Sequence, residues 1–455
     1  MTVSRPAEFP KSPLWLRPVP LLAVVALPSA AATYWLSQGA FLEAWQEPKF
    51  FTRGDFAWCL TFVALFSVSI ALASSITLFR SRQLIGGDAA PRDVREELPL
   101  DILVKLFRVL FWTTIVGYCI WTVVAIRRGV RLGNILALIG RSGDSVNNLK
   151  HQLTSVSGLT TVVGVGIGAA IVGSYILFVH KDTSVKRRMW VLICLSAIRA
   201  LLNSERLALV EIVVPIVIIW VMARLIASQN IRRTRRRLIL VPLLAPLVLL
   251  SYFAVSEYFR SYAYYSQFEQ TSLASYSITR LEGYYIVSYN DGALLEDHYV
   301  RAHELPYFTI EAFWRTPIIS SVLRYQNLAG VDPTTEEAAI YTQFANPNFN
   351  NPGGIMVIEL DYGAKIGAIF TVLFGWGIGK IWLSWRRGRA AGLLVYPFVM
   401  VGLLELPREW YWWSGRAFPG LAALCIALIV VRRHQRNSKD GASVDASIAE
   451  VSASH

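Results

Sequence analysis

The sequence predicts an all-α, polytopic membrane protein with about ten transmembrane helices and one large extracytoplasmic loop. Three observations lead to this fold class. Hydrophobic residues occupy 54% of the 455 positions and the mean hydropathy is +0.43, which is too apolar for an ordinary soluble chain. Apolar stretches of membrane-spanning length recur along the chain. Arginine clusters flank several of them, and a polar segment of about 95 residues interrupts the series late in the chain.

The apolar stretches give the expected helices in order, each judged against the about 20 apolar residues that cross a bilayer. They lie near 18–38, 56–80, 103–126, 158–180, 189–203, 207–227, 238–258, 364–385, 391–405 and 416–431. The stretch at 189–203 is the shortest. A secretory signal peptide is the alternative for the first stretch, because basic residues precede a run that ends in "SAAA". The long preceding region and Trp35 favour a helix.

The basic connections set the expected orientation, since lysine and arginine in short loops favour the cytoplasmic side. "RRTRRR" at 232–237 is the strongest cluster, and counting outward from it places both termini in the cytoplasm. The basic connection at 127–157 breaks the pattern, because it would lie outside. The net charge of +13 is mostly explained by the inner loops and their attraction to anionic membrane lipid, so no nucleic acid is required.

The expected organisation has four parts. Residues 1–258 hold transmembrane helices 1–7, and 259–353 form the extracytoplasmic loop. Residues 354–431 hold helices 8–10, and 432–455 form a disordered cytoplasmic tail. Loops as long as 259–353 are usually functional or disordered. Many tyrosines and apolar positions argue against disorder there, so short helices over the membrane face are expected.

The cations of the long loop are all arginines. They are Arg260, Arg280, Arg301, Arg315 and Arg324. A planar guanidinium holds phosphate oxygens in pairs and stays charged at any working pH, which suits a diphosphate ligand. The alternative is that these arginines form structural ion pairs with the acidic residues of the same loop.

Two further stretches place polar and aromatic side chains near the expected outer face. In "YYIVSYNDG", Tyr284 and Tyr285 stand beside acids and amides, a combination that suits sugars. The alternative is an interfacial tyrosine belt. In "LPREWYWWSGR", Arg408 lies in an outer turn, where charge is either functional or paired with its neighbour Glu409.

No cofactor or metal is expected. The four cysteines are scattered over predicted membrane segments, and no histidine pair has a metal-binding spacing. No phosphate-binding glycine loop is present, and "GVGIGA" at 164–169 indicates a close-packing helix face.

Two local patterns resemble the O-antigen polymerase family, whose members have many membrane helices and one large outer loop. "NSERLALVE" is similar to a family stretch at a helix start and maps onto Ser204, Arg206 and Leu209. "FNNPGGIMVIELDYGAKIG" is similar to a family segment that ends in an aspartate, an aromatic residue and G-x-x-x-G. That segment maps onto Asn350, Asn351, Asp361, Tyr362, Gly363 and Gly367. Glu205 departs from the family pattern, which has a small polar residue before the arginine.

The resemblance implies a GT-C-like, metal-independent glycosyltransferase in the bacterial cytoplasmic membrane. Such an enzyme joins polyprenyl-diphosphate-linked oligosaccharide repeat units into a surface polysaccharide at the outer membrane face. The implied partners are that lipid-linked glycan, membrane lipid and a chain-length regulator. With the resemblance, the catalytic candidates are Asp361, Arg206 and Arg280. The substrate-binding candidates are Arg301, Arg315, Arg324, Tyr284, Tyr285, Asn350, Asn351, Lys365 and Arg408.

Asp361 and Lys365 are expected one turn apart on one helix face, where the lipid diphosphate meets water. The alternative is a helix-start carboxylate that interacts with the helix dipole and with Lys365. A glycan ligase of the same superfamily, or a transporter or flippase of lipid-linked sugars, would share most of these features.

Overall fold

The computed structural model is helical, with no strand among the residues that it describes. Those residues are 12–85, 94–131, 133, 161–202, 207–228, 230–258, 262, 272–300, 303–346 and 349–453. Within this part of the chain, eight helical segments are long and apolar enough to cross a membrane. The prediction of an all-α, multi-pass membrane protein is therefore confirmed, whereas only eight of the ten expected spans reach that length.

The eight segments follow the expected order along the chain. They are α1 (Pro18–Trp35), α3 (Arg53–Ile85), α5 (Leu100–Arg127), the segment Val162–Val179 with α8 (Val165–Ser174) at its centre, α10 (Leu207–Ile226), the pair α11 (Ile231–Leu238) and α12 (Leu240–Glu257), α19 (Met356–Arg386), and α21 (Phe418–Ala453). The other two predicted stretches form α9 (Lys186–Leu202) and α20 (Ala390–Glu405), which are shorter.

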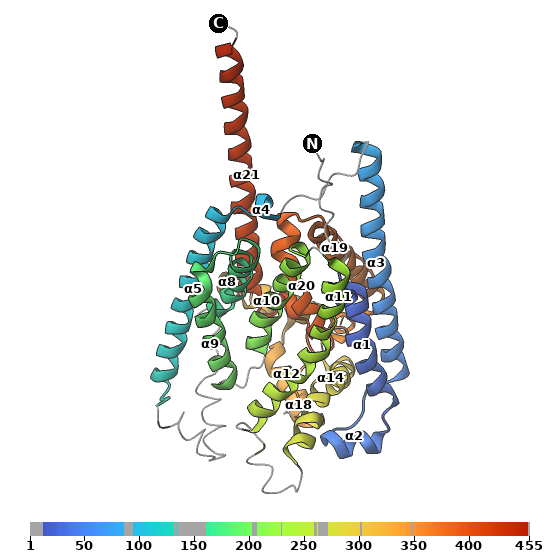
Figure 1. The fold of residues 1–455 in the computed structure, drawn as a ribbon. Helices are drawn as coiled ribbons and strands as arrows, with labels where there is room; N and C mark the ends of the chain where they lie inside the picture. The colour runs from blue at the N-terminus through green and yellow to red at the C-terminus, as the bar shows by residue number, and fades with distance from the viewer. Residues whose placement is uncertain are drawn as a thin grey trace.

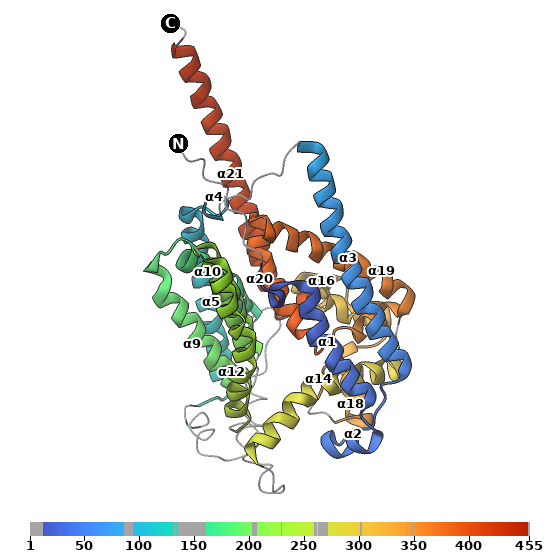
Figure 2. The ribbon, with the colours of Figure 1, turned by 45° about the vertical axis from the view of Figure 1, so that its right-hand side comes forward.

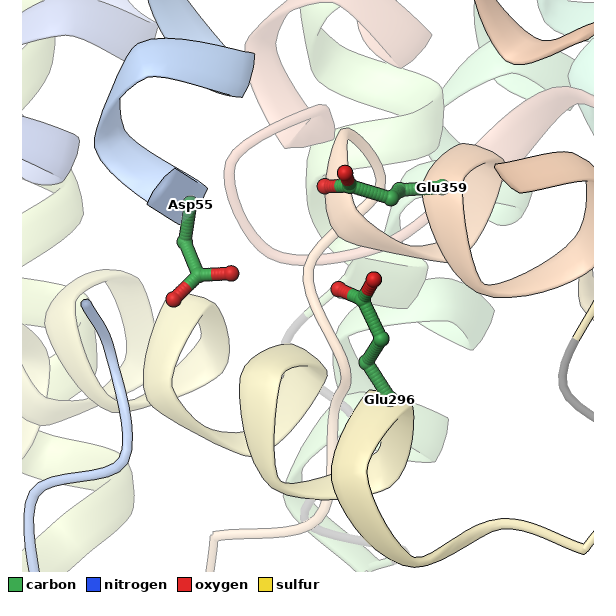
Figure 3. A group of neighbouring side chains, drawn as sticks. All are labelled: Asp55, Glu296 and Glu359. Carbon is green, nitrogen blue, oxygen red and sulfur yellow. The ribbon is translucent and has the colours of Figure 1, made fainter. Parts of the chain in front are cut away.

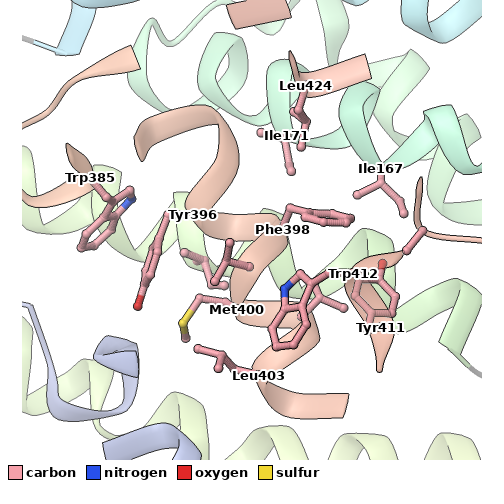
Figure 4. Packing of buried hydrophobic residues seen from close by; sticks show 14 of the residues in the cluster. Ile167, Ile171, Trp385, Tyr396, Phe398, Met400, Leu403, Tyr411, Trp412 and Leu424 are labelled. Atoms are coloured by element: carbon pink, nitrogen blue, oxygen red, sulfur yellow. The ribbon is translucent and has the colours of Figure 1, made fainter. Parts of the chain in front are cut away.

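Helix α20 lies in the core of the molecule. Figure 4 shows Tyr396, Phe398 and Met400 of α20 packed among apolar side chains from other helices, including Trp385 of α19. The apolar composition of α20 therefore reflects burial against protein.

Helices α3 and α19 pack closely because glycines face the contact. A Cβ added at Gly379 would lie 2.7 Å from Cβ of Ala73 and 3.1 Å from Cα of Ile70. Glycine has no side chain, so two helix backbones can approach closely at such a position. Close van der Waals packing of this kind holds membrane helices together, because no hydrophobic driving force acts between them in lipid.

The C-terminal part of α21 projects from one end of the molecule, and α2 and α18 lie toward the other (Figures 1 and 2). We call the second end the loop end. It comprises α2 (Gln38–Trp45), α14 (Leu273–His298), η6 (Phe308–Ile310), α15 (Glu311–Arg315), α16 (Pro317–Val322), α17 (Tyr325–Ala329), α18 (Pro333–Phe344) and the residues that connect them.

Two expected features differ in the structure. The loop contains short helices, but α14 has 26 residues and packs against α1 and α19, so it is as much a part of the bundle as of the loop. The tail predicted to be disordered continues α21 as a helix to Ala453 and projects from the bundle (Figure 1).

Candidate functional site

Two arginines meet at one tyrosine at the loop end. The guanidinium carbon of Arg280 lies 6.0 Å from the ring centroid of Tyr284, and that of Arg408 lies 5.5 Å from the same centroid. Arg280 and Tyr284 are four residues apart on α14, so they share a helix face. Arg408 comes from the turn after α20, 128 positions from Arg280 in the sequence. The fold therefore gathers three of the predicted site residues.

Each arginine of this pair has carboxylates near it, Glu257 beside Arg280 and both Glu405 and Glu409 beside Arg408. Nε of Arg280 lies 3.9 Å from Oε2 of Glu257, beyond hydrogen-bond distance. The guanidinium of Arg280 also lies over the ring of Phe349, at 4.8 Å. Nη1 of Arg408 donates to Oε2 of Glu405 over 3.2 Å. Arg280 is only 8% exposed, so most of its charge is shielded from bulk water.

Asp361 has a different environment from the one that the sequence predicts. Its side chain is buried, and its Oδ1 accepts hydrogen bonds from the backbone N–H groups of Tyr307 (3.0 Å) and Phe308 (3.2 Å). Its Oδ2 accepts from N–H and Oγ1 of Thr309, both at 2.6 Å. A carboxylate with both oxygens engaged in this way holds the chain at η6 in place, which is the geometry of a positioning residue.

The expected pairing of Asp361 with Lys365 on one helix face is wrong. Gly363 lies between them with φ 65° and ψ 167°, a conformation that favours glycine and interrupts α19. The spacing of four residues therefore no longer brings side chains together, and Lys365 is exposed to solvent. The G-x-x-x-G pattern marks a break in the helix here.

A cavity of about 340 Å³ lies beside the segment that Asp361 holds. Its walls come from Tyr307, Phe308 and Glu311, from α18, from residues 350–352, and from the turn at 409–414. Asn350 and Asn351, predicted to bind substrate, line it. Its volume is in the range of small-ligand sites.

A buried polar cluster joins the start of α3 to α14. Asn290 donates from Nδ2 to Oε1 of Glu47 (2.6 Å) and to the carbonyl of Pro48 (2.9 Å). Burial raises the pKa of Glu47 to about 7. Burial, and next the charge of Glu47, raise the pKa of the fully buried Asp291 well above its usual range. Two such carboxyl groups do not both ionise readily at neutral pH.

Three carboxylates could hold a metal ion. Asp55 of α3, Glu296 of α14 and Glu359 of α19 bring one oxygen each to within 4.8 Å of one another, and Figure 3 shows them pointing together. Oxygen ligands of this kind suit Mg²⁺ or Ca²⁺. Nε2 of His303 lies 3.9 Å from Oε1 of Glu296. Acidic groups commonly gather without an ion, and we assign no metal function to them.

The remaining predicted residues are spread over the loop end or fall outside the described residues. Nη1 of Arg315 lies 2.9 Å from Oε1 of Glu311, and Nε of Arg315 donates to Oη of Tyr307 (3.2 Å), so this arginine has structural partners. Arg324 is exposed to solvent, and Tyr285 is partly buried on α14. Arg206 and Arg301 lie outside the described residues.

The residues that sequence reasoning missed are acidic. Glu337 and Glu409 line the cavity, while Glu47 and Asp291 lie in the buried cluster. Glu337 sits on a helix with an ordinary polar pattern, and Glu47 belongs to a short connection before a membrane helix. The sequence around Glu337 and Glu47 does not indicate a functional role, because these side chains come close to other acidic groups only when distant segments of the chain pack together.

Comparisons of the chain with family models, curated proteins and solved structures gave no match.

Proposed function

We propose that the chain is a glycosyltransferase that joins polyprenyl-diphosphate-linked oligosaccharide units at the outer face of the bacterial cytoplasmic membrane, with both termini in the cytoplasm. The observation that supports this most is the convergence of Arg280 and Arg408 on Tyr284. Two guanidinium groups that contact the same tyrosine ring, one of them largely buried, suit the two charged groups of a diphosphate.

The arrangement suits a transfer in which the diphosphate leaves. The hydroxyl oxygen of the acceptor sugar forms a bond to the anomeric carbon of the donor glycan, and the bond from that carbon to the lipid diphosphate breaks. Arg280 and Arg408 stabilise the negative charge that builds up on the leaving diphosphate. The hydroxyl proton passes to a carboxylate, and Glu409 is the cavity-lining candidate, because burial raises the pKa of Glu337 to about 8 and Glu311 pairs with Arg315.

The role of Asp361 in this proposal differs from the catalytic one that the sequence predicts. It holds the backbone of Tyr307 and Phe308, which line the cavity, and so it shapes the acceptor side of the site. Asn350 and Asn351 remain substrate-binding candidates because they line the same cavity.

The test compares lysine substitutions at four arginines, because lysine keeps the charge and loses the planar fork. In a strain whose own copy of the gene is deleted, Arg280→Lys and Arg408→Lys should abolish long polymer and accumulate single lipid-linked repeat units. Arg53→Lys and Arg324→Lys are the matched controls, because both side chains are exposed. Both controls should keep most of the polymer at equal protein abundance.

Binding to purified protein gives a second measurement that does not depend on catalysis. Polyprenyl diphosphate should raise the melting temperature of the wild-type protein more than polyprenyl monophosphate does, and Arg280→Lys and Arg408→Lys should remove the difference. Normal polymer from both variants, with diphosphate stabilisation intact, would overturn the proposal. Loss of lipid-linked units from the outer face, with polymerisation of supplied units unchanged, would indicate a transporter instead.

A further inference from the structure

One stretch of the long loop exposes large apolar side chains although it lies outside the membrane-spanning segments. Residues 316–331, "TPIISSVLRYQNLAGV", include no acidic residue and a single basic one, Arg324. The stretch forms α16 and α17. Val322 is 75% exposed and Leu323 49% exposed where the two helices join, and Leu328 of α17 is 60% exposed. Exposed apolar side chains that concentrate in one place mark a surface that meets a protein or a membrane.

The other side of α17 is fixed to the loop end. The ring centroid of Tyr325 lies 5.0 Å from that of Tyr307 and 5.1 Å from that of Trp314. The hydroxyl group of Tyr325 donates to the carbonyl of Leu305 over 2.8 Å. Ala329, four residues further along α17, is also buried. The stretch therefore has one face that packs against protein, while its apolar side chains between and beside these contacts stay exposed.

The part of the loop that holds α17 is tied to the ends of two membrane spans. Asp361, near the start of α19, accepts from the backbone N–H groups of Tyr307 and Thr309. Glu311 of α15 accepts from the N–H of Gly415 over 3.2 Å, and the span of α21 begins three residues later at Phe418. Residues 307–315 therefore lie at the level where α19 and α21 leave the bilayer.

An exposed tryptophan lies at the same level. The ring of Trp413 stacks on that of Phe418, with 5.5 Å between the centroids, and Trp413 is 37% exposed. Tryptophan is enriched where membrane spans meet the headgroup layer. Helix α15 contacts η7 (Tyr411–Trp413), and Phe313 of α15 is itself 37% exposed. Helix α15 thus lies at the interface between lipid and water, and α16 and α17 follow it directly.

We propose that residues 316–331 anchor the loop end to the membrane, with Val322, Leu323 and Leu328 inserted into the interfacial layer of the leaflet on that side. Phospholipid fits this surface, because apolar side chains meet the acyl chains and no carboxylate of the stretch repels the headgroup phosphates. The cation of Arg324 can remain among the headgroups while its stem lies along the apolar surface, and a lysine would do the same.

The anchor also sets the position of the cavity. Tyr325 packs against Tyr307, and Tyr307 lines the cavity beside Asp361. Fixing α17 to the lipid surface therefore holds one wall of the cavity at the level where a lipid-linked ligand arrives. The inference goes beyond the proposed function, because a transporter of such ligands would use the same anchor.

Spin labels test the insertion on the purified full-length protein in nanodiscs of phosphatidylethanolamine and phosphatidylglycerol. In a background without the four native cysteines, a single labelled cysteine replaces Val322, Leu323 or Leu328. Collisions of the label with O₂, which dissolves in lipid, are compared with collisions with a water-soluble nickel chelate. Ile369→Cys, 61% exposed on the span of α19, is the lipid control, and Gln343→Cys, exposed on α18, is the water control.

The ratio of O₂ collisions to chelate collisions should be high at all three positions. It should approach the ratio at Ile369 and exceed the ratio at Gln343 by at least about threefold, because an apolar solute is driven out of water and the chelate is not. A ratio equal to that at Gln343 would show the stretch in water and overturn the proposal. Few collisions with either reagent would show that protein covers it, and spectral broadening between labels would identify a second copy. Either result would also overturn the lipid anchor.

A double variant assigns the insertion to particular side chains. Val322→Asp combined with Leu323→Asp should lower the ratio of a label at Leu328 to that of Gln343, because carboxylates are costly at membrane depth. Val300→Asp, at a position that is 69% exposed outside the stretch, is the matched control and should leave the ratio unchanged. All three substituted side chains are exposed, and a melting curve checks that each variant is folded. An unchanged ratio in the double variant would overturn the assignment to Val322 and Leu323.

Discussion

Asn290 of α14 donates a hydrogen bond of 2.6 Å to Glu47, which lies 243 positions earlier in the chain. The other side of the same amide accepts from the backbone N–H groups of Phe50 (2.6 Å) and Phe51 (3.0 Å). One buried side chain therefore ties the start of α3 to the helix that carries Arg280 and Tyr284. The arginine pair depends on this tie, because α14 sets the position of one of its members.

Asn290→Ala should destabilise the protein strongly. It leaves several buried polar groups without partners, and each such group costs about 1–3 kcal/mol, so we expect a loss of at least about 3 kcal/mol. The measurement is the thermal unfolding of the purified protein in detergent. Asn327→Ala, at an exposed position of α17, is the control and should change stability by less than about 0.5 kcal/mol. Equal melting temperatures for the two variants would show that the amide is dispensable.

Glu47 should make stability depend on pH. Its pKa in the folded protein is raised by burial from an ordinary value of 4.5 to about 7, so the folded state binds a proton more tightly than the unfolded state does. The contribution of that proton to the free energy of unfolding is complete below about pH 4.5 and is lost as the pH rises through about 7. The raised pKa of Asp291 acts in the same direction.

Glu47→Gln should make this dependence less steep between pH 5 and pH 8, since an amide cannot ionise and can still accept from Asn290. Melting temperatures over that range are the measurement. Glu43→Gln, at an exposed position of α2, should keep the slope of the wild-type protein. A slope that survives in Glu47→Gln would assign the pH dependence to other groups.

Asp361→Asn should loosen the loop end, because the new amide donor faces backbone N–H donors in place of an acceptor. The expected cost is about 1–3 kcal/mol, with faster proteolytic cleavage between residues 303 and 316. Polymer synthesis should fall together with this loosening. Lys365→Gln should be mild, because that side chain is exposed. Lost polymer with unchanged proteolysis would restore a direct catalytic role for Asp361.

Two glycines of α19 should respond oppositely to alanine. Gly379→Ala places a methyl group 2.7 Å from Cβ of Ala73, so α3 and α19 must separate, at a cost of about 1–3 kcal/mol. Gly377→Ala meets no atom within 4 Å and should be neutral or stabilising by up to about 1 kcal/mol. Melting temperatures in detergent distinguish them. Similar values for both would contradict the packing of α3 against α19.

Single cysteines should report the orientation of the chain. In a background without the four native cysteines, Ser275→Cys and Ser414→Cys should react with a membrane-impermeant thiol reagent in intact cells. Ser438→Cys, on the part of α21 that leaves the bundle, should react only after lysis. Ser275 and Ser438 are exposed in the structure, so access is not limited by packing. The reverse labelling pattern would place the loop end in the cytoplasm.

The sequence by itself determined the class of the protein and most of its helices. Long apolar stretches must be buried in lipid or in protein, and only helices satisfy their own backbone hydrogen bonds there, so length and hydropathy suffice. The sequence also indicated Arg280, Tyr284 and Arg408 individually, from residue chemistry and position near the expected outer face. It could not show that α20, which is apolar throughout, lies buried among the other helices.

Only the tertiary structure decided which of these residues meet. Arg280 and Arg408 lie on segments 128 positions apart, and no local periodicity records that such segments pack together. The environment of Asp361 likewise depends on the backbone of a distant segment at 307–309, and the break at Gly363 separates it from Lys365. A carboxylate acts according to the donors and charges around it, and those neighbours are set by packing between elements rather than by the sequence on either side.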